Sequence, residues 1–243
     1  MTKKTVRTGT GSKVRLDLDG FEVVLLARRH RRARHISLRI DPAADDGAVL
    51  VLPWNVPLDE GLNFARSKAR WLRRSLAALP PRIPFIDGAR IPVLGNEHVI
   101  RHHPSFGPAI WSEATVIHVG GDSDPIRVGD RVKRWLRELA RREITRKVEG
   151  KAKQIDRPYG RITIRDARTR WGSCTEDGNL AFSWRLILAP ERVLDYVVGH
   201  EVAHLKELNH GPRFREVERF LVPDNDTANR WLNREGNALL RYG

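Results

Sequence analysis

The chain has 243 residues, of which 40% are hydrophobic and 30% are charged, so it can bury the core of one large domain or of two small ones. Its only cysteine, Cys174, excludes a disulfide within the chain, which fits a reducing compartment. The formal net charge of +14 favours anionic partners such as nucleic acid, nucleotides or anionic lipid, or it simply keeps an arginine-rich protein soluble.

The sequence carries no sign of export or of membrane insertion. No stretch approaches the roughly 20 apolar residues that a membrane-spanning helix needs. The chain begins Met1-Thr2-Lys3-Lys4, and no apolar run typical of a signal peptide follows. We therefore expect a cytoplasmic protein without a membrane span.

The first predicted elements are three strands, over residues 21–27, 35–40 and 48–52, the last of which ends at Pro53. The connection between the first two strands is Arg28-Arg29-His30-Arg31-Arg32-Ala33-Arg34. This basic segment is either a solvated hairpin loop or a contact for phosphate groups.

Residues 58–78 are predicted to form one helix, because apolar residues recur there at helical spacing and arginine or lysine fills the other faces. Pro80-Pro81 ends this helix. Residues 83–120 resemble short strands interrupted by glycine and proline. The N-terminal region is thus expected to be mostly β, with one helix.

The composition changes after the segment 120–125, Gly-Gly-Asp-Ser-Asp-Pro, and we place a domain boundary there. The expected domains are a β-rich domain over residues 1–125 and a catalytic domain over residues 126–243. The second domain opens with a long basic amphipathic helix over residues 127–149.

Two strands and three helices are predicted to complete the chain, which makes it an α+β protein. The strands cover residues 161–165 and 179–188. The first helix begins near Pro190 and runs to about Leu208, where Gly211-Pro212 follows. Further helical stretches cover about 213–221 and 226–240.

The segment Gly199-His200-Glu201-Val202-Ala203-His204 fits the pattern H-E-x-x-H within the first of these helices. His200 and His204 lie one turn apart on one side of the helix, so their imidazoles can share one Zn²⁺ ion. Glu201 is then placed to reach a water at the metal rather than the metal itself, and to act as general base.

His210 is the preferred third ligand, because it stands at the end of the helix, just before Gly211-Pro212, where the chain can turn back. Three protein ligands leave one position for water, which is typical of a catalytic zinc site. The alternative third ligand is a carboxylate further along the chain, Glu216 or Glu218.

The spacing of His200, His204 and His210 equals that of metzincins, H-E-x-x-H-x-x-G-x-x-H. Two departures argue against ordinary membership of that group. Glu207 occupies the glycine position, and the only methionine is Met1, so a methionine-containing turn cannot lie beneath the metal.

Several further stretches surround this motif, and together with it they resemble a known family over about residues 161–240. They are Arg170-Trp171-Gly172-Ser173-Cys174, Gly178-Asn179-Leu180, Ser183-Trp184-Arg185-Leu186, Asp195-Tyr196-Val197-Val198, Asn209-His210 with Phe214, and Leu221-Val222-Pro223-Asp224. The family is the YgjP-like metallopeptidase domain, a relative of the SprT and WLM zinc peptidases. A looser resemblance covers the N-terminal part, through a basic strand pair, a helix ending near Pro80 and Phe85-Ile86-Asp87-Gly88.

The resemblance implies a compact zincin-type core of helices packed on a small sheet, with His200, His204 and His210 as ligands of one Zn²⁺ ion and Glu201 as general base. The implied function is a zinc metallopeptidase acting on peptides or proteins. Two alternatives stay open: a nucleotide (UTP) pyrophosphatase that uses the same metal site, and a basic nucleic-acid-associated protein with a structural metal.

Two neighbours of the motif carry further expectations. The predicted strand over residues 179–188 precedes the helix, as the strand that borders the cleft does in zincins, and an open edge there would pair with an extended peptide substrate. Cys174 is a nucleophile, a ligand or a small buried hydrophobic residue, and we favour the last.

Overall fold

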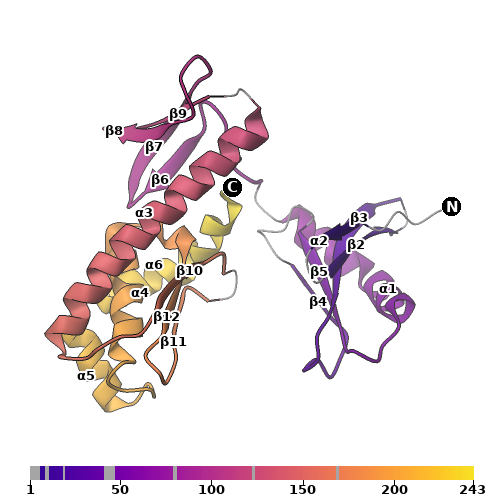
Figure 1. Ribbon diagram of the computed structural model, residues 1–243. Helices are drawn as coiled ribbons and strands as arrows, with labels where there is room; N and C mark the ends of the chain where they lie inside the picture. The colour runs from indigo at the N-terminus through magenta and orange to yellow at the C-terminus, as the bar shows by residue number, and fades with distance from the viewer. Residues whose placement is uncertain are drawn as a thin grey trace. The chain divides into compact units, whose positions relative to one another are not determined.

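The computed structural model describes residues 6–8, 11–18, 20–40, 47–78, 81–121, 124–167 and 170–243. These residues form six α-helices and three β-sheets, so the expected mixed α+β class is confirmed. The chain divides into two compact units, Met1–Pro81 and Arg82–Gly243 (Figure 1). The expectations placed on Met1-Thr2-Lys3-Lys4 and on Pro80 lie outside the described residues.

A five-stranded sheet with the order β1-β2-β3-β5-β4 organises the first unit. Its strands are Val6–Thr8, Gly11–Asp17, Glu22–Arg29, Ser37–Ile40 and Ala48–Leu52, numbered β1 to β5. β3 and β5 are parallel, and the other neighbours are antiparallel. All five residues of β5 are buried, as expected for a central strand with apolar residues at every position.

Two helices, α1 (Leu58–Ser67) and α2 (Ala69–Ala77), stand where one helix over 58–78 was predicted. The interruption is at Lys68, which has non-helical φ and ψ angles of −105° and 16°. Its amide donates to the carbonyl of Ala65, three residues back, so the turn tightens there. Leu62, Ala65 and Leu72 on either side of this turn all pack in one core with the sheet.

The second unit begins with a four-stranded sheet of order β6-β7-β9-β8. Its strands are Arg90–Val93, Asn96–His103, Ile110–Glu113 and Val116–Gly120, numbered β6 to β9. The long helix α3 (Pro125–Gln154) packs Val128 and Val132 into the same core as Ile117 of this sheet. The compositional boundary at 125 therefore lies at the first residue of α3, inside this unit; residues 122–123 beside it are not described.

A small sheet of order β10-β12-β11 lies next to the sequence motif. Its strands are β10 (Ile162–Arg165), β11 (Gly172–Cys174) and β12 (Leu180–Ser183), and β12 is parallel to β10 and antiparallel to β11. The strand predicted over 179–188 is too long, because Trp184–Leu188 form a 3₁₀ helix, η1, whose five side chains are all buried.

The condition for peptide pairing, an open edge on this strand, is not met. β12 is the central strand, and β10 and β11 take up both of its hydrogen-bonding edges. Among the described residues β11 pairs with β12 alone, so the open edge beside the motif belongs to β11.

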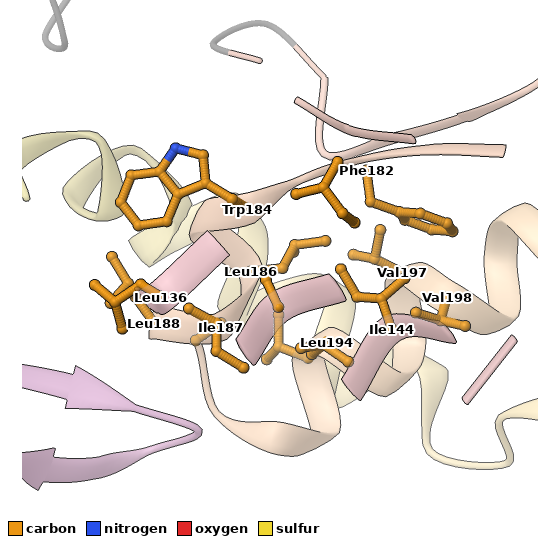
Figure 2. Packing of buried hydrophobic residues seen from close by; sticks show 14 of the residues in the cluster. Leu136, Ile144, Phe182, Trp184, Leu186, Ile187, Leu188, Leu194, Val197 and Val198 are labelled. Atoms are coloured by element: carbon orange, nitrogen blue, oxygen red, sulfur yellow. The ribbon is translucent and has the colours of Figure 1, made fainter. Parts of the chain in front are cut away.

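Three helices and a final 3₁₀ turn complete the unit: α4 (Glu191–Ala203), α5 (Pro212–Leu221), α6 (Asn225–Glu235) and η2 (Gly236–Arg241). Figure 2 shows Leu194, Val197 and Val198 of α4 packed against residues of η1 and α3. The ammonium of Lys151, on α3, donates to Asp195 and to the carbonyl of Leu221, which ties α3 to α4 and to the end of α5. No described helix is both long and apolar enough to cross a membrane.

Candidate metal centre

Helix α4 directs His200 and Glu201 toward the site because its other faces are buried. Val193, Leu194, Val197, Val198 and Val202 are each at most 4% exposed. The helix also approaches the end of α5 closely at Gly199, where a β-carbon would collide with the side chain of Val222. The helix ends at Ala203, and His204 is its C-terminal cap.

The imidazoles of His200, His204 and His210 converge. Each offers a ring nitrogen, and these three atoms all lie within 4.8 Å of one another. The Nε2 atoms of His200 and His210 are 3.1 Å apart, close to the separation of about 3.3 Å between nitrogens on a tetrahedral zinc. The donor set therefore fits one ion, and the structure brings together the three histidines that the sequence singled out.

The other ring nitrogens of two of these histidines are held by hydrogen bonds. Nδ1 of His200 lies 2.7 Å from Oε1 of Glu218, and Nδ1 of His204 lies 3.0 Å from the backbone carbonyl of Glu207. Each Nδ1–H donates to its oxygen, which leaves Nε2 free as a ligand atom. Burial lowers the pKa of His204, and this favours the neutral imidazole that a metal requires.

Glu218, one of the two alternative third ligands, is engaged in orienting His200. Its second oxygen, Oε2, accepts a hydrogen bond of 3.1 Å from the amide of Asn225. Burial by itself would raise the pKa of Glu218, but the hydrogen bond from His200, the electrostatic attraction of that ring and the Asn225 bond outweigh burial and lower it. A charged carboxylate at this place fixes the His200 ring. The other alternative, Glu216, is exposed.

Phe214 forms the floor of the histidine cluster, a role that the sequence analysis missed. The residue is 1% exposed, and its ring centroid lies 5.1, 4.5 and 4.7 Å from those of His200, His204 and His210. It comes from the first turn of α5, four residues after His210. The sequence does hold one signal for this role, because Phe214 belongs to one of the stretches that carry the family resemblance, together with Asn209-His210. The methionine-containing turn of metzincins is absent from this chain, whose only methionine is Met1. The ring of Phe214 provides an apolar surface against the three histidines instead.

Glu201 is buried beside the cluster, with 7% of its surface exposed. Burial raises its pKa to about 7, although electrostatic attraction by His200 and Arg170 acts in the opposite direction. Its side chain packs directly on the backbone of Gly172 in β11: a β-carbon at Gly172 would lie 2.5 Å from Cγ and Oε1 of Glu201. A glycine at this position therefore makes room for the carboxylate.

The comparison with protein families agrees with this geometry. The sequence model of the family described as YgjP-like, metallopeptidase domain, matches residues 34–235, which is most of the chain. The chain belongs to this YgjP-like family. A search of curated proteins and a search of solved structures each found no match.

The single cysteine of this YgjP-like domain lies near Glu201 but is poorly suited to nucleophilic chemistry. Cys174 is partly exposed, and its thiol lies 3.4 Å from the carbonyl of Thr175. Burial, followed by the negative charge of Glu201, raises the pKa of the thiol to about 11. A thiol that stays protonated at neutral pH is a weak nucleophile and a weak ligand.

The open edge of β11 presents backbone groups beside Glu201. The amides of Ser183 and Thr175 donate to the carbonyls of Trp171 and Asn179, so the odd-numbered residues of this segment face β12. In an antiparallel pair the residues between them point the other way, which turns the N–H and C=O groups of Gly172 and Cys174 away from the sheet. Within the described residues these groups have no hydrogen-bond partner.

Proposed function

We propose that this YgjP-like domain is a zinc metallopeptidase of the zincin type, with His200, His204 and His210 as the ligands of one Zn²⁺ ion and Glu201 as general base. The observation that carries the proposal is the convergence of three imidazole nitrogens beside the buried carboxylate of Glu201, which follows His200 on α4. Three imidazoles and one remaining position are the donor set of catalytic zinc.

His200, His204 and His210 would hold a zinc ion, which would supply a Lewis acid for the carbonyl under attack and for the attacking water. Glu201 accepts the proton of the attacking water and then returns it to the amine that leaves. Glu201 is buried and packs on the backbone of Gly172, and this contact holds its carboxylate in place for both transfers. Glu218 and the carbonyl of Glu207 keep the His200 and His204 rings oriented throughout.

The β11 edge supports a peptide as the substrate. An extended peptide can add to an open strand edge through its main chain, and Gly172 and Cys174 offer their N–H and C=O groups there. Because Gly172 also contacts Glu201, a peptide paired with this edge passes the general base. A nucleoside triphosphate, the alternative substrate, would make no use of such an edge.

The test is an assay of the zinc-loaded protein against casein and, in parallel, against nucleoside triphosphates including UTP. We expect casein to be cleaved, and Glu201→Gln to keep its zinc while turnover falls at least about a hundredfold. Hydrolysis of UTP without cleavage of casein would replace the peptidase with the pyrophosphatase. Full activity of Glu201→Gln would overturn the mechanism for either substrate.

A further inference from the structure

Two connections leave the first sheet at the same edge. β3 and β5 are parallel, with Arg29 opposite Leu52, so the loop after β3 and the turn after β5 begin side by side (Figure 1). The amide of His30 donates to the carbonyl of Leu52, which joins the two connections at their start. We name this surface, formed by Arg31, Arg32, Arg34 and Trp54, the Arg–Trp edge.

Arg29 holds the turn that carries Trp54. Its Nη1 donates to the carbonyls of Pro53, Trp54 and Val56, at 3.3, 2.7 and 2.5 Å. The turn is thus fixed, yet Trp54 itself is 65% exposed. Because the turn is fixed, the exposed indole is held at a defined place, where a planar group can stack on it.

The two connections themselves carry charge of one sign, before Asp59 and Glu60 open α1. Residues 28–36 and 52–57 include five arginines and two histidines but no aspartate, glutamate or lysine. Arg31, Arg32 and Arg34 are exposed, and their side chains make no hydrogen bond or ion pair with any described residue. A guanidinium offers paired donors that match phosphate oxygens, and it also stacks on planar groups.

We propose that the Arg–Trp edge binds single-stranded nucleic acid, with a base stacked on Trp54 and neighbouring phosphates held by Arg31, Arg32 and Arg34. Arginines that have no partner among the described residues, together with an exposed aromatic ring, are the two parts of such sites. A single strand fits better than a duplex, because only unpaired bases offer a free face to the indole. One indole offers too little apolar area to anchor the chain in a lipid surface.

The test is titration of a fluorescent oligothymidylate with the full chain, by anisotropy, over a series of salt concentrations. We expect Trp54→Ala to weaken binding about 5- to 150-fold, the effect of losing one stacked base. Replacing Arg31, Arg32 and Arg34 together with glutamine should reduce the slope of log affinity against log salt by about 2, because each phosphate that is no longer neutralised lowers this slope by about 0.7.

Two matched variants separate this surface from the overall charge. Trp71→Ala removes another exposed tryptophan of the same unit, and glutamine at Arg134, Arg137 and Arg142 of α3 removes the same three charges elsewhere. Both should bind like wild type, and thermal unfolding checks that all four variants are folded. Equal losses in the matched variants would overturn the proposal. So would a failure of wild type to bind at low salt, or equally tight binding of duplex DNA or of vesicles rich in anionic phospholipid.

Discussion

At the scale of single residues, the proposed role of Glu201 as general base combines two opposed requirements. A general base must lose its proton near neutral pH, yet a buried carboxylate without a salt bridge destabilises the fold when it is charged. The pKa of about 7 expresses this conflict, since the ordinary value is 4.5. Function and stability should therefore separate when this carboxyl is replaced.

We predict that Glu201→Gln stabilises the metal-free protein, and more so at pH 8 than at pH 5. Between pH 4.5 and about 7 the folded state holds a proton that the unfolded state releases, so wild type loses stability as pH rises through this window. Above it the loss is complete. Urea unfolding at the two pH values should give a gain for the variant that is about 2–3 kcal/mol larger at pH 8. A gain independent of pH would contradict the raised pKa.

Glu218 is predicted to tune the metal rather than bind it. Glu218→Gln keeps a hydrogen-bond acceptor for Nδ1 of His200 but removes the charge, so zinc affinity should fall about 10- to 100-fold with one ion still bound. The measurement is competition with a zinc chelator. Glu216→Gln is the matched control and should bind zinc like wild type; a loss there equal to that of Glu218→Gln would revive Glu216 as a ligand.

At the scale of elements, the short strand β11 requires a glycine at its first position, Gly172, because the side chain of Glu201 packs against it. Gly172→Ala places a methyl group where Cγ and Oε1 of Glu201 now lie, so the carboxylate must shift. We predict that kcat falls about tenfold to a hundredfold, while zinc stoichiometry is retained. Gly150→Ala on α3, where a β-carbon meets no neighbour within 4 Å, is the control and should leave kcat unchanged. Normal activity of Gly172→Ala would show that Glu201 tolerates displacement.

The elements differ in how far the sequence predicts them. The apolar periodicity of α3 and α4 is local, so their identity as helices follows from the sequence, as does the placement of His200 and Glu201 on α4 with His204 at its C-terminal end. The central position of β12 in its sheet cannot be predicted in this way. It depends on pairing with β10 and β11, which lie elsewhere in the chain. The helix break at Lys68 is not predicted either, because the spacing of apolar residues continues through Lys68 although α1 ends before it and α2 begins after it.

The site itself divides in the same way. The three histidines and Glu201 share a recognisable spacing, whereas Phe214, Gly172 and Glu218 act through contacts that only the folded chain creates. Glu218 lies 18 residues from its partner His200, and nothing in that separation distinguishes an orienting carboxylate from a ligand. Spacing identifies groups on one helix, and packing decides what supports them.

At the scale of the whole molecule, the two units have separate cores. One cluster of buried apolar residues draws on residues between Leu16 and Leu72, the other on residues between Phe85 and Leu239, and they share no member. The three histidines all belong to the second unit, where they join the end of α4 to the start of α5. A metal bound there stabilises one core directly and has no ligand in the other.

We therefore predict that zinc raises the unfolding temperature of one transition and leaves a second unchanged. A ligand at a hundred times its Kd adds about 2.7 kcal/mol to the unit that binds it. The variant with Trp54→Phe and Trp71→Phe keeps tryptophan in the second unit alone, so its fluorescence reports that unit while calorimetry reports both. Chelation should shift the fluorescence transition and one calorimetric peak, and His210→Ala should be insensitive to zinc in both. A single peak that moves as a whole would mean that the units unfold together, and an unshifted fluorescence transition would mean that the ion binds elsewhere.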